Sequence, residues 1–293
     1  MRFRRVLVTG ANGFLASALL PLLKKRLPRA KVVAASRKTS DLADCGAARR
    51  LIARARPDLV MHLAGARPPA DLDALWRDNV TATIRLCAAL RGTGARLVVA
   101  GSSGEYGPAP KRPVSEDFPA NPLTLYGRVK HAQTLAALSF VHEGLDVRVA
   151  RLFNVLGPGT PESLAPGAFA AQAARLERAG GGTLKVGDLR PTRDYIDVRD
   201  AAAGLLAVAL APALSGCTNV CSGRGVAMSQ VLEGILDAAR APLKAVRDPA
   251  RLRAVEVRGI TGSHARLTRA AGWRPRVALE RSLKDTLAWH RSA

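Results

Sequence analysis

The chain has 293 residues, of which 48% are hydrophobic and 23% are charged, and this globular composition excludes an intrinsically disordered protein. A chain of this length predicts about two domains. Lys and Arg number 45 against 23 Asp and Glu, which leaves a net charge of +22. Because the basic residues are scattered and do not form blocks, the charge disfavours a nucleic-acid partner and favours attraction of an anionic small molecule.

Membrane, secretion and metal signals are weak in this sequence. No stretch reaches the roughly 18 uninterrupted apolar residues that a membrane span needs. Val6-Leu7-Val8 runs into a glycine turn, which predicts a strand and not a signal peptide. The 4 cysteines do not suit a disulfide framework in so long a chain, and the close pair Cys217 and Cys221 has no histidine cluster beside it. We therefore expect a cytoplasmic protein that contacts no membrane and binds no metal.

Short apolar runs alternate with helix-like segments through the first half of the chain. The runs are continuous and not alternating, which is typical of strands in a parallel sheet covered on both faces. The expected strands are 5–8, 31–35, 59–63, 96–100 and 147–152, and the expected helices are 14–27, 47–56, 71–91 and 124–142. This order predicts the α/β class with a Rossmann-like doubly wound parallel sheet, whose ligands bind outside the carboxyl ends of the strands.

After Asn154 the pattern changes to loops and shorter, mixed elements. Gly157-Pro158-Gly159 and the segment 161–166 predict loops, and a helix is expected over 169–179, before a triple glycine at 180–182. We predict a dinucleotide-binding domain over 1–155, to which a segment near 195–215 returns. Residues 156–293 are expected to form mainly a smaller, mixed C-terminal lobe that binds substrate.

A glycine turn lies between the first expected strand and the first expected helix. Gly10 and Gly13 allow a tight turn in which the backbone closely approaches a pyrophosphate. Because the helix begins there, its N-terminal N–H groups and its dipole face the phosphates. A glycine turn that holds no ligand is the alternative. The residues expected to bind a dinucleotide here are Gly10, Asn12, Gly13, Phe14 and Leu15.

The end of the second strand distinguishes between the two nicotinamide dinucleotides. An acidic residue there would bind the ribose 2′-hydroxyl of NAD, but this chain has Ser36-Arg37-Lys38. Two cations and a hydroxyl suit the 2′-phosphate of NADP, so NADP(H) is favoured over NAD(H), and ordinary exposed loop charges are the alternative. Asp41 and Leu42 are expected near the adenine, and Leu63-Ala64-Gly65 is expected to form a wall of the groove.

Tyr126 and Lys130 are four residues apart in an expected helix and therefore lie on one face. An ammonium beside a phenol stabilises the phenolate and lowers the pKa of the tyrosine from about 10. The pair can then pass a proton to or from a carbonyl or alcohol oxygen. Ser102 and Ser103 follow the preceding strand and supply hydroxyls that orient this oxygen. We predict these four residues as catalytic, although the tyrosine–lysine spacing alone is usually an ordinary helix face.

With these motifs in this order, the chain resembles the extended short-chain dehydrogenase/reductase family, the NAD(P)-dependent sugar epimerases and dehydratases, over nearly its whole length. The resemblance makes Tyr126 the acid/base, Lys130 its activator and a ribose ligand, and Ser102 the partner of the substrate oxygen. It also places Asn79 near the cofactor, where it would support a water or a backbone bond, and an ordinary polar helix residue is the alternative. The substrate diphosphate contacts that it implies are Asn154 and Arg193.

Within the family, the stretches 101–107, 154–159 and 248–253 resemble the GDP-4-keto-6-deoxy-D-mannose reductases. In that group an arginine and an acid three residues apart clamp the phosphate and ribose of a GDP-sugar, which implies substrate roles for Arg253 and Glu256. Ala254 replaces an expected proline and Asp188 replaces a more usual asparagine, and both departures bear on the nucleotide. The other residues expected at the substrate are Ser103 and Glu105.

A chemical argument favours a reductase over a dehydratase. Elimination of water across C5–C6 needs an acid/base pair, which the family places directly after the catalytic serine, where this chain has Ser103 and Gly104. We therefore expect NAD(P)H-dependent reduction of a nucleotide-linked 4-keto-6-deoxyhexose. The alternatives are an NDP-sugar 4-epimerase that holds NAD tightly, and a non-catalytic dinucleotide sensor or nucleic-acid binder. The resemblance also implies a homodimer formed through the helices over 71–91 and 124–142.

Overall fold

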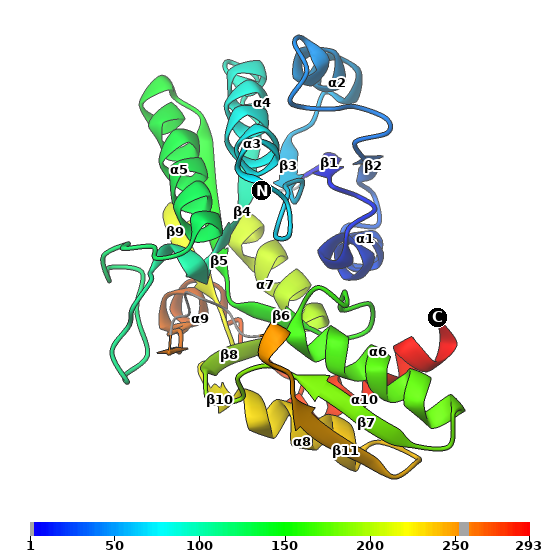
Figure 1. Ribbon diagram of the computed structural model, residues 1–293. Helices are drawn as coiled ribbons and strands as arrows, with labels where there is room; N and C mark the ends of the chain where they lie inside the picture. The colour runs from blue at the N-terminus through cyan, green and yellow to red at the C-terminus, as the bar shows by residue number, and fades with distance from the viewer. Residues whose placement is uncertain (1–2, 252–257) are drawn as a thin grey trace.

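The fold is built on a six-stranded parallel sheet, as a computed structural model that describes residues 3–251 and 258–293 shows (Figure 1). The strand order is β2-β1-β3-β4-β5-β9. The strands are β1 (Arg5–Thr9), β2 (Lys31–Ala35), β3 (Leu59–His62), β4 (Arg96–Ser102), β5 (Asp146–Leu152) and β9 (Gly216–Val220). The order reverses between β1 and β3, and sheets of this kind bind ligands outside the carboxyl ends of the strands at such a reversal. The predicted fold class is confirmed.

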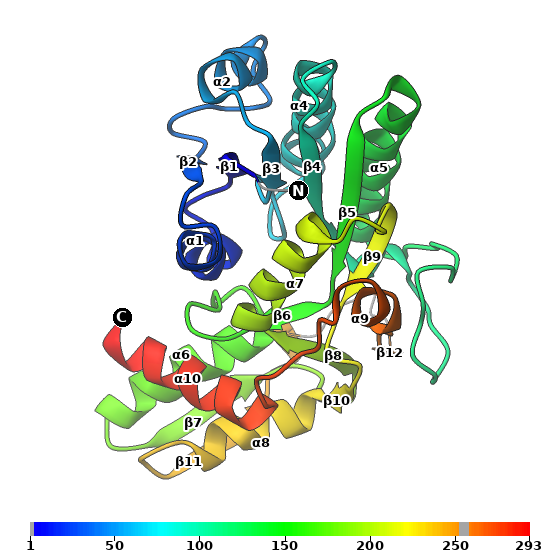
Figure 2. The same cartoon turned by 180° about the vertical axis from the view of Figure 1, so that it is seen from behind.

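Successive side chains of β1 enter two separate cores, which explains why the strand is apolar without alternation. Val6 and Val8 pack with α1 (Phe14–Arg26) and α7 (Val198–Leu210) on one face of the sheet. Leu7 packs with α2 (Ala47–Ala55) and α4 (Ala82–Leu90) on the other face, where α5 (Leu125–Ser139) covers β4 and β5 (Figure 2). The sheet is thus sandwiched between two layers of helices, and its carboxyl edge is left for a site.

The helix predicted over 71–91 is continuous and contains a π-helical turn. It runs from α3 (Leu72–Trp76) through the π-helical turn η1 (Arg77–Thr81) into α4. Asp71 caps its N-terminus by accepting a hydrogen bond from the Ala74 N–H (2.8 Å). A π-helical turn inserts one residue and is frequently found at functional sites. Here it contains Asp78 and Asn79, and both side chains are buried.

The C-terminal lobe has its own apolar core between helices and short strands. Leu156, Phe169, Leu184, Val231 and Leu287 belong to this core. The helices are α6 (Ala165–Arg178), α8 (Met228–Asp237) and α10 (Leu279–Ser292). The strands β6 (Asn154–Leu156), β8 (Thr192–Asp197), β10 (Gly225–Ala227) and β12 (Gly259–Ile260) pair with one another through β8, and β7 (Gly182–Val186) pairs with β11 (Leu243–Arg247).

Two segments of the second half pack against the first. Helix α7 lies on α1 and on strands β4 and β5, and β9 extends the sheet beside β5. Helix α9 (Ala265–Ala271) in turn packs on α7 and β9. The exact division of the chain into two domains stays a prediction.

The start of α6 differs from its prediction. The segment 161–166 was expected to be a loop, but α6 begins at Ala165 with Pro166 in its first turn. Proline is tolerated there because the first N–H groups of a helix have no partner within the helix. Across the described residues, no helix combines the length and the apolar character that crossing a membrane requires.

Candidate active site

The glycine turn after β1 packs closely against the backbone at Ala64, which only a glycine at position 10 permits. Gly10 has a φ of +70°, and a Cβ added to it would lie 2.6 Å from the Ala64 backbone nitrogen. The Gly13 N–H donates to the Gly10 carbonyl (2.9 Å) and closes the turn directly before α1. The turn, the close approach and the helix N-terminus together fit a dinucleotide pyrophosphate. Asn12, Phe14 and Leu15 lie in this turn and the first turn of α1, as expected.

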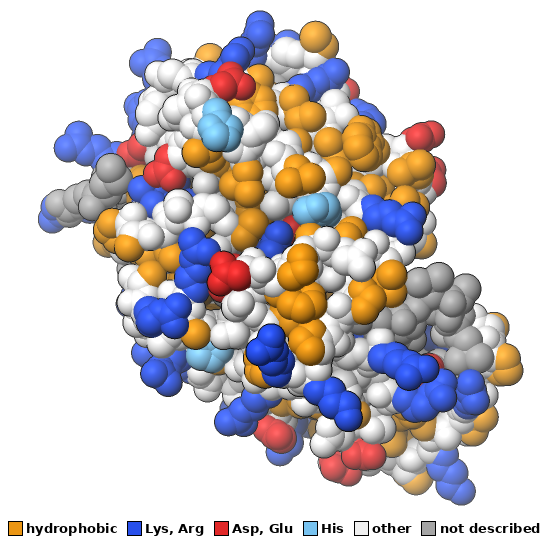
Figure 3. Space-filling model, turned by 90° about the vertical axis from the view of Figure 1, so that its left-hand side faces the viewer, with side chains coloured by type: hydrophobic (Ala, Val, Ile, Leu, Met, Phe, Trp, Pro, Cys, Tyr) orange, Lys and Arg blue, Asp and Glu red, His pale blue; other side chains and the backbone are white. Residues whose placement is uncertain are grey.

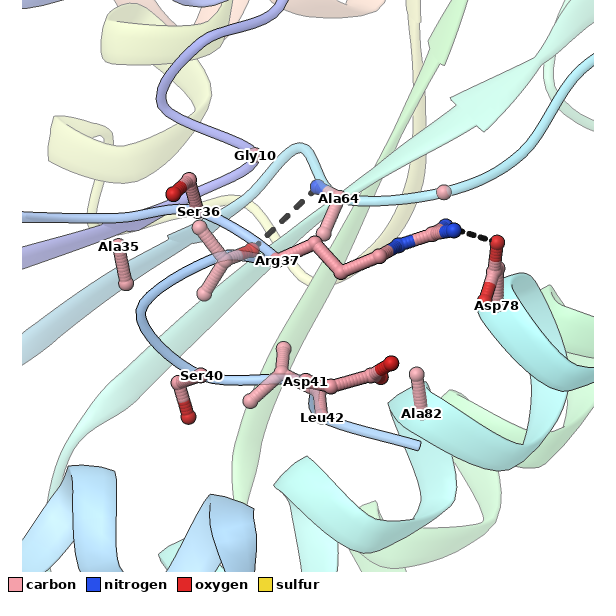
Figure 4. A pocket seen from close by; sticks show the side chains of 12 residues that line it. Gly10, Ala35, Ser36, Arg37, Ser40, Asp41, Leu42, Ala64, Asp78 and Ala82 are labelled. Carbon is pink, nitrogen blue, oxygen red and sulfur yellow. Dashed lines mark hydrogen bonds and ion pairs between the residues drawn. The ribbon is translucent and has the colours of Figure 1, made fainter. Parts of the chain in front are cut away.

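A pocket opens beside this turn at the carboxyl ends of β1, β2 and β3 (Figure 4). It brings together most of the residues expected at the adenosine half of the cofactor. Its lining is Thr9, Gly10, Ala35, Ser36, Arg37, Ser40, Asp41, Leu42, Ala64, Gly65, Asp78 and Ala82. Two of the expected residues do not line the pocket: Lys38 is exposed, and Leu63 is half-buried and directly precedes Ala64 in the chain. The pocket lies at the reversal of strand order, where the fold predicts a ligand.

Arg37 crosses this pocket and forms an ion pair with Asp78 (Figure 4). Asp78 also accepts a hydrogen bond from Arg77 (3.0 Å), and Arg77 binds Asp41 (2.7 Å). Beside Arg77 the pKa of the Asp41 carboxyl is lowered, despite the opposing effect of its burial. Asp78 was not predicted to lie here, because it is 41 residues from its partner and a buried aspartate in a helix carries no local signal for such a contact.

Asn79 does not line the adenosine pocket, and its side chain makes backbone hydrogen bonds near the site, which is one of the roles expected for it. Its side chain is buried, and its amide group donates to the carbonyls of Leu75 (2.8 Å) and Ala66 (3.0 Å). A Cβ added to Gly65 would lie 2.4 Å from the Asn79 Oδ1 atom. Asn79 therefore supports the loop after β3 from the protein interior, and this loop forms a wall of the pocket.

Tyr126 stands at the start of α5, whose N-terminus is capped by Thr124 accepting from the Gly127 N–H (3.0 Å). The phenol is half-buried and shares a hydrogen bond with the Ser102 side chain at the end of β4. Ser102 itself caps the short helical turn 103–105 by accepting from the Gly104 N–H (3.1 Å). The predicted tyrosine–serine pair is thus assembled, while Ser103 is mostly buried beside it.

The pKa of Tyr126 differs from the expectation. We expected the neighbouring ammonium to lower it, but burial, followed by the negative charge of Glu105, raises it to about 12. The positive charge of Arg67 and the hydrogen bond with Ser102 act in the opposite direction. Tyr126 is therefore a neutral phenol at neutral pH, which is the form that donates a proton.

Glu105 does not face the substrate, which corrects its expected role. Its side chain is fully buried, with Oε1 accepting from the Ser102 backbone N–H (2.9 Å) and Oε2 bound to Arg151 (3.1 Å). Arg151 also stacks over the Tyr106 ring, with its Cζ atom 4.7 Å from the ring centroid. Both carboxylate oxygens are thus engaged beneath Ser102, so Glu105 positions the serine loop and sets the local charge.

Lys130 lies one turn after Tyr126 and is buried. Its ammonium donates to the Ala100 carbonyl on β4 (2.6 Å) and to the Gln133 side chain. Burial lowers the pKa of Lys130 to about 8, and the charge of Glu105 opposes this change. These two hydrogen bonds hold the lysine beneath the end of β4. The contact with Gln133 was not predicted from the sequence.

The two residues expected at the substrate diphosphate, Asn154 and Arg193, lie on two paired strands of the C-terminal lobe. Asn154 on β6 donates to the Asp194 carbonyl (3.3 Å), and Arg193 on β8 donates to the Thr192 carbonyl (2.9 Å). Asp194 is buried and accepts from the backbone N–H groups of Ser222 (2.7 Å), Gly223 (2.9 Å) and Gly262 (3.1 Å), which fixes the loops around these strands. Arg253 and Glu256 lie outside the described residues.

Arg67 spans the two halves of the chain near Tyr126. It projects from the loop after β3 and donates to the Ser163 hydroxyl (2.9 Å) in the loop before α6. Its charge acts on the Tyr126 phenol, so it lies near the proposed reacting centre. Arg67 was not predicted to lie here, because an arginine in a polar loop carries no distinguishing sequence pattern.

Two features define the class of this site. The glycine turn at a helix N-terminus fits a dinucleotide, and the protonated tyrosine, with its serine and lysine, can exchange a proton with a carbonyl or alcohol oxygen. This is the arrangement of an NAD(P)-dependent oxidoreductase.

Comparisons with known proteins specify the family. The chain matches the model of the NAD dependent epimerase/dehydratase family over residues 6–220. It is 34% identical over 242 residues to GDP-6-deoxy-D-mannose reductase of Pseudomonas aeruginosa, covering 79% of this chain and 80% of that protein. It is 30% identical to UDP-glucose 4-epimerase of Mycolicibacterium smegmatis over an alignment of 319 residues, covering 98% of this chain and 99% of that protein.

A solved structure agrees with this match. The structure of RMD from Pseudomonas aeruginosa complexed with NADPH has a TM-score of 0.85 and 31% identity, covering 98% of this chain and 99% of that chain. The chain belongs to the NAD dependent epimerase/dehydratase family. The predicted family and enzyme class are confirmed.

Proposed function

We propose that the protein reduces the 4-keto group of a nucleotide-linked 4-keto-6-deoxyhexose. The observation that carries this proposal is the pairing of a neutral Tyr126 phenol with Ser102 while the adjacent carboxylate, Glu105, is fully buried and engaged. Reduction of a ketone needs one proton donor, whereas dehydration also needs a base that reaches the sugar. The identity to GDP-6-deoxy-D-mannose reductase supports a GDP-linked substrate.

In this mechanism a bound nicotinamide supplies the hydride that reduces the ketone carbon. Tyr126 donates its phenolic proton to the ketone oxygen as that oxygen gains negative charge, and the ketone becomes an alcohol. Ser102 orients the oxygen, and the Lys130 ammonium stabilises the phenolate that the transfer leaves. We assign Asn154 and Arg193 to the diphosphate, because an amide and a guanidinium on paired strands offer donors to phosphate oxygens.

NADP(H) is the cofactor that we propose, in preference to NAD(H). Arg37 and Ser36 line the adenosine pocket, so a 2′-phosphate there would compete with the Asp78 carboxylate for the Arg37 guanidinium. Arg37→Ala should weaken NADPH binding about tenfold or more and leave NADH binding nearly unchanged. Arg54→Ala removes the same charge from the exposed face of α2 and serves as the control. Equal weakening of both cofactors in Arg37→Ala would argue against the preference.

An NDP-sugar 4-epimerase is the second candidate, favoured by the identity to UDP-glucose 4-epimerase over nearly the full chain. It would use the same tyrosine to oxidise and then re-reduce C4. The test is to incubate the purified enzyme with NADPH and either a GDP-, UDP- or dTDP-linked 4-keto-6-deoxyhexose or the corresponding saturated sugar. Stoichiometric NADPH consumption with the keto sugar supports the reductase. Interconversion of C4 epimers with no net NADPH consumption supports the epimerase instead.

A homodimer is also part of the proposal. Large apolar side chains are exposed on the adjacent helices α3, α4 and α5, among them Trp76 (48% exposed), Ile84 (40%) and Leu135 (57%). Figure 3 shows hydrophobic side chains gathered on the side of the molecule where α5 lies. Such a surface is costly in water unless a second copy covers it. Leu135→Lys should convert a dimer into a monomer in light scattering, and a wild-type monomer at high concentration would refute this part.

A further inference from the structure

A buried chain of hydrogen bonds connects Lys130 to the strand that ends in the glycine turn. Lys130 donates to the Gln133 Oε1 atom, and Gln133 Nε2 donates to the Thr83 hydroxyl (2.8 Å). The Thr83 hydroxyl lies 3.0 Å from His62 Nε2, and His62 Nδ1 lies 2.7 Å from the Thr9 hydroxyl. All five side chains are buried, and they come from α5, α4, β3 and β1. Thr9 also lines the adenosine pocket.

The donors and acceptors in this chain can be arranged in only one way. Lys130 has no acceptor, so the Gln133 carbonyl oxygen faces it and the Gln133 amide nitrogen faces Thr83. Thr83 gives its only hydrogen to the Asn79 carbonyl (2.5 Å), so His62 must donate to Thr83 from Nε2. His62 is neutral, because burial and then the charge of Lys130 lower its pKa to about 3. Its Nδ1 therefore accepts from Thr9.

This arrangement places the amide oxygen of Gln133, and not its nitrogen, against the Lys130 ammonium. The charged and titratable groups around its ammonium are Glu105, which opposes deprotonation, and neutral His62, with Tyr126 one helical turn away. The Ala100 carbonyl and the Gln133 amide oxygen are its hydrogen-bond acceptors, so among the described residues one N–H of the ammonium is left for a ligand. Gln133 can present its oxygen only because Thr83 holds the other end of the amide.

We propose that Gln133 is a positioning residue for the reaction, and that Thr83 and His62 hold its amide so that its oxygen keeps the Lys130 ammonium charged and in place. This inference rests on the proposed role of Lys130 beside Tyr126. An acceptor that binds the charged form of an amine favours that form, and its loss favours the neutral amine. The buried chain therefore controls the pH at which Lys130 stops supporting proton transfer.

Two substitutions at Gln133 separate this role from simple packing. Gln133→Leu keeps the size and removes the acceptor, so the pKa of Lys130 and the alkaline limit of kcat/KM should both fall, by about one pH unit. Gln133→Glu places a negative charge there, so both should rise by about one pH unit. The control is Gln172→Leu, which removes an amide that binds backbone carbonyls on α6 and β7 and should change neither quantity.

The pKa of Lys130 can be measured without substrate or cofactor. Lysine labelled with 13C at Cε reports each ammonium by NMR, and the Lys130 signal is assigned by its loss in Lys130→Met. Opposite pKa shifts in the two Gln133 variants support the inference. If these shifts occur but the activity profiles do not follow, the hold of Gln133 on the Lys130 ammonium stands, and the role of both residues in the reaction fails. An unchanged Lys130 pKa in both variants overturns the inference.

Substitutions at Thr83 provide a second test if a Gln133 variant does not fold. Thr83→Val removes the hydroxyl with little change of shape, so the Gln133 amide loses its partner and the Lys130 pKa should fall, by less than in Gln133→Leu. Thr83→Ser restores the hydroxyl and should restore the wild-type pKa. Equal behaviour of the valine and serine variants would contradict the proposed hold of Thr83 on Gln133.

Discussion

His62 should make the protein sensitive to acid, and the size of the effect follows from its burial. The imidazole lies between the hydroxyls of Thr9 and Thr83 with no exposed surface. The pKa of His62 is lowered from 6.5 to about 3 in the folded protein. At mildly acidic pH His62 is therefore protonated in the unfolded chain but neutral in the folded chain. The unfolded state therefore binds more protons, and the free energy of unfolding falls as the pH drops from 6.5 toward 3.

The slope of this loss approaches about 1.4 kcal/mol per pH unit well below pH 6.5, and the loss amounts to roughly 2 kcal/mol between pH 6.5 and 4.5. Other groups also titrate in this range, so a matched variant is needed. His62→Gln keeps a donor and an acceptor in the same place but does not titrate. At pH 7 we expect it to be less stable than the wild type by about 1 kcal/mol, because amide geometry differs from that of imidazole.

The assay is chemical unfolding by urea at a series of pH values for both proteins. Because the other titrating groups are shared, their contributions cancel in the difference between the two free energies of unfolding. That difference should shrink on acidification and change sign above pH 4.5. Parallel curves, with a constant difference from pH 7 to 4.5, would refute the account of His62 as a neutral link in the buried chain.

Two further substitutions test the site. Glu105→Gln should destabilise the protein by about 3–5 kcal/mol, because it leaves the Arg151 charge buried without a counter-charge. It should also lower the pKa of Tyr126, because the negative charge of Glu105 raises that pKa. Urea unfolding measures the first change and phenol absorbance titration the second, and a variant as stable as the wild type would contradict the buried pair. Gly10→Ala should abolish tight NADPH binding in a fluorescence titration, because its Cβ would meet Ala64, whereas Gly92→Ala has a similar φ of +71° with nothing within 4 Å and should bind normally. Normal binding by Gly10→Ala would argue against the pyrophosphate turn.

The fold was predictable because its signals are local and repeated. Continuous apolar runs such as Val6-Leu7-Val8, each followed by a helical pattern, identify a parallel sheet before any contact is known. The glycine turn and the Tyr126–Lys130 spacing are also short-range patterns, so their positions at the carboxyl edge followed from the strand order.

The orientation of side chains around the site was not predictable in the same way. Glu105 turns inward because Arg151, 46 residues away, meets it beneath the serine loop. Arg37 meets Asp78 across 41 residues, and Gln133 meets Thr83 across 50. Each of these pairs depends on how separate elements pack, and a buried charge or amide has no periodicity that reveals its partner.

The claim on which the account depends is that Tyr126 donates the proton while a cofactor lies in the adjacent groove. The most direct measurement is the single-turnover rate of NADPH oxidation by Tyr126→Phe, with the dissociation constant of NADPH measured on the same sample. We predict that the rate falls by about 100- to 10,000-fold while the affinity for NADPH changes little. A variant that oxidises NADPH at the wild-type rate with a 4-keto sugar would contradict the account.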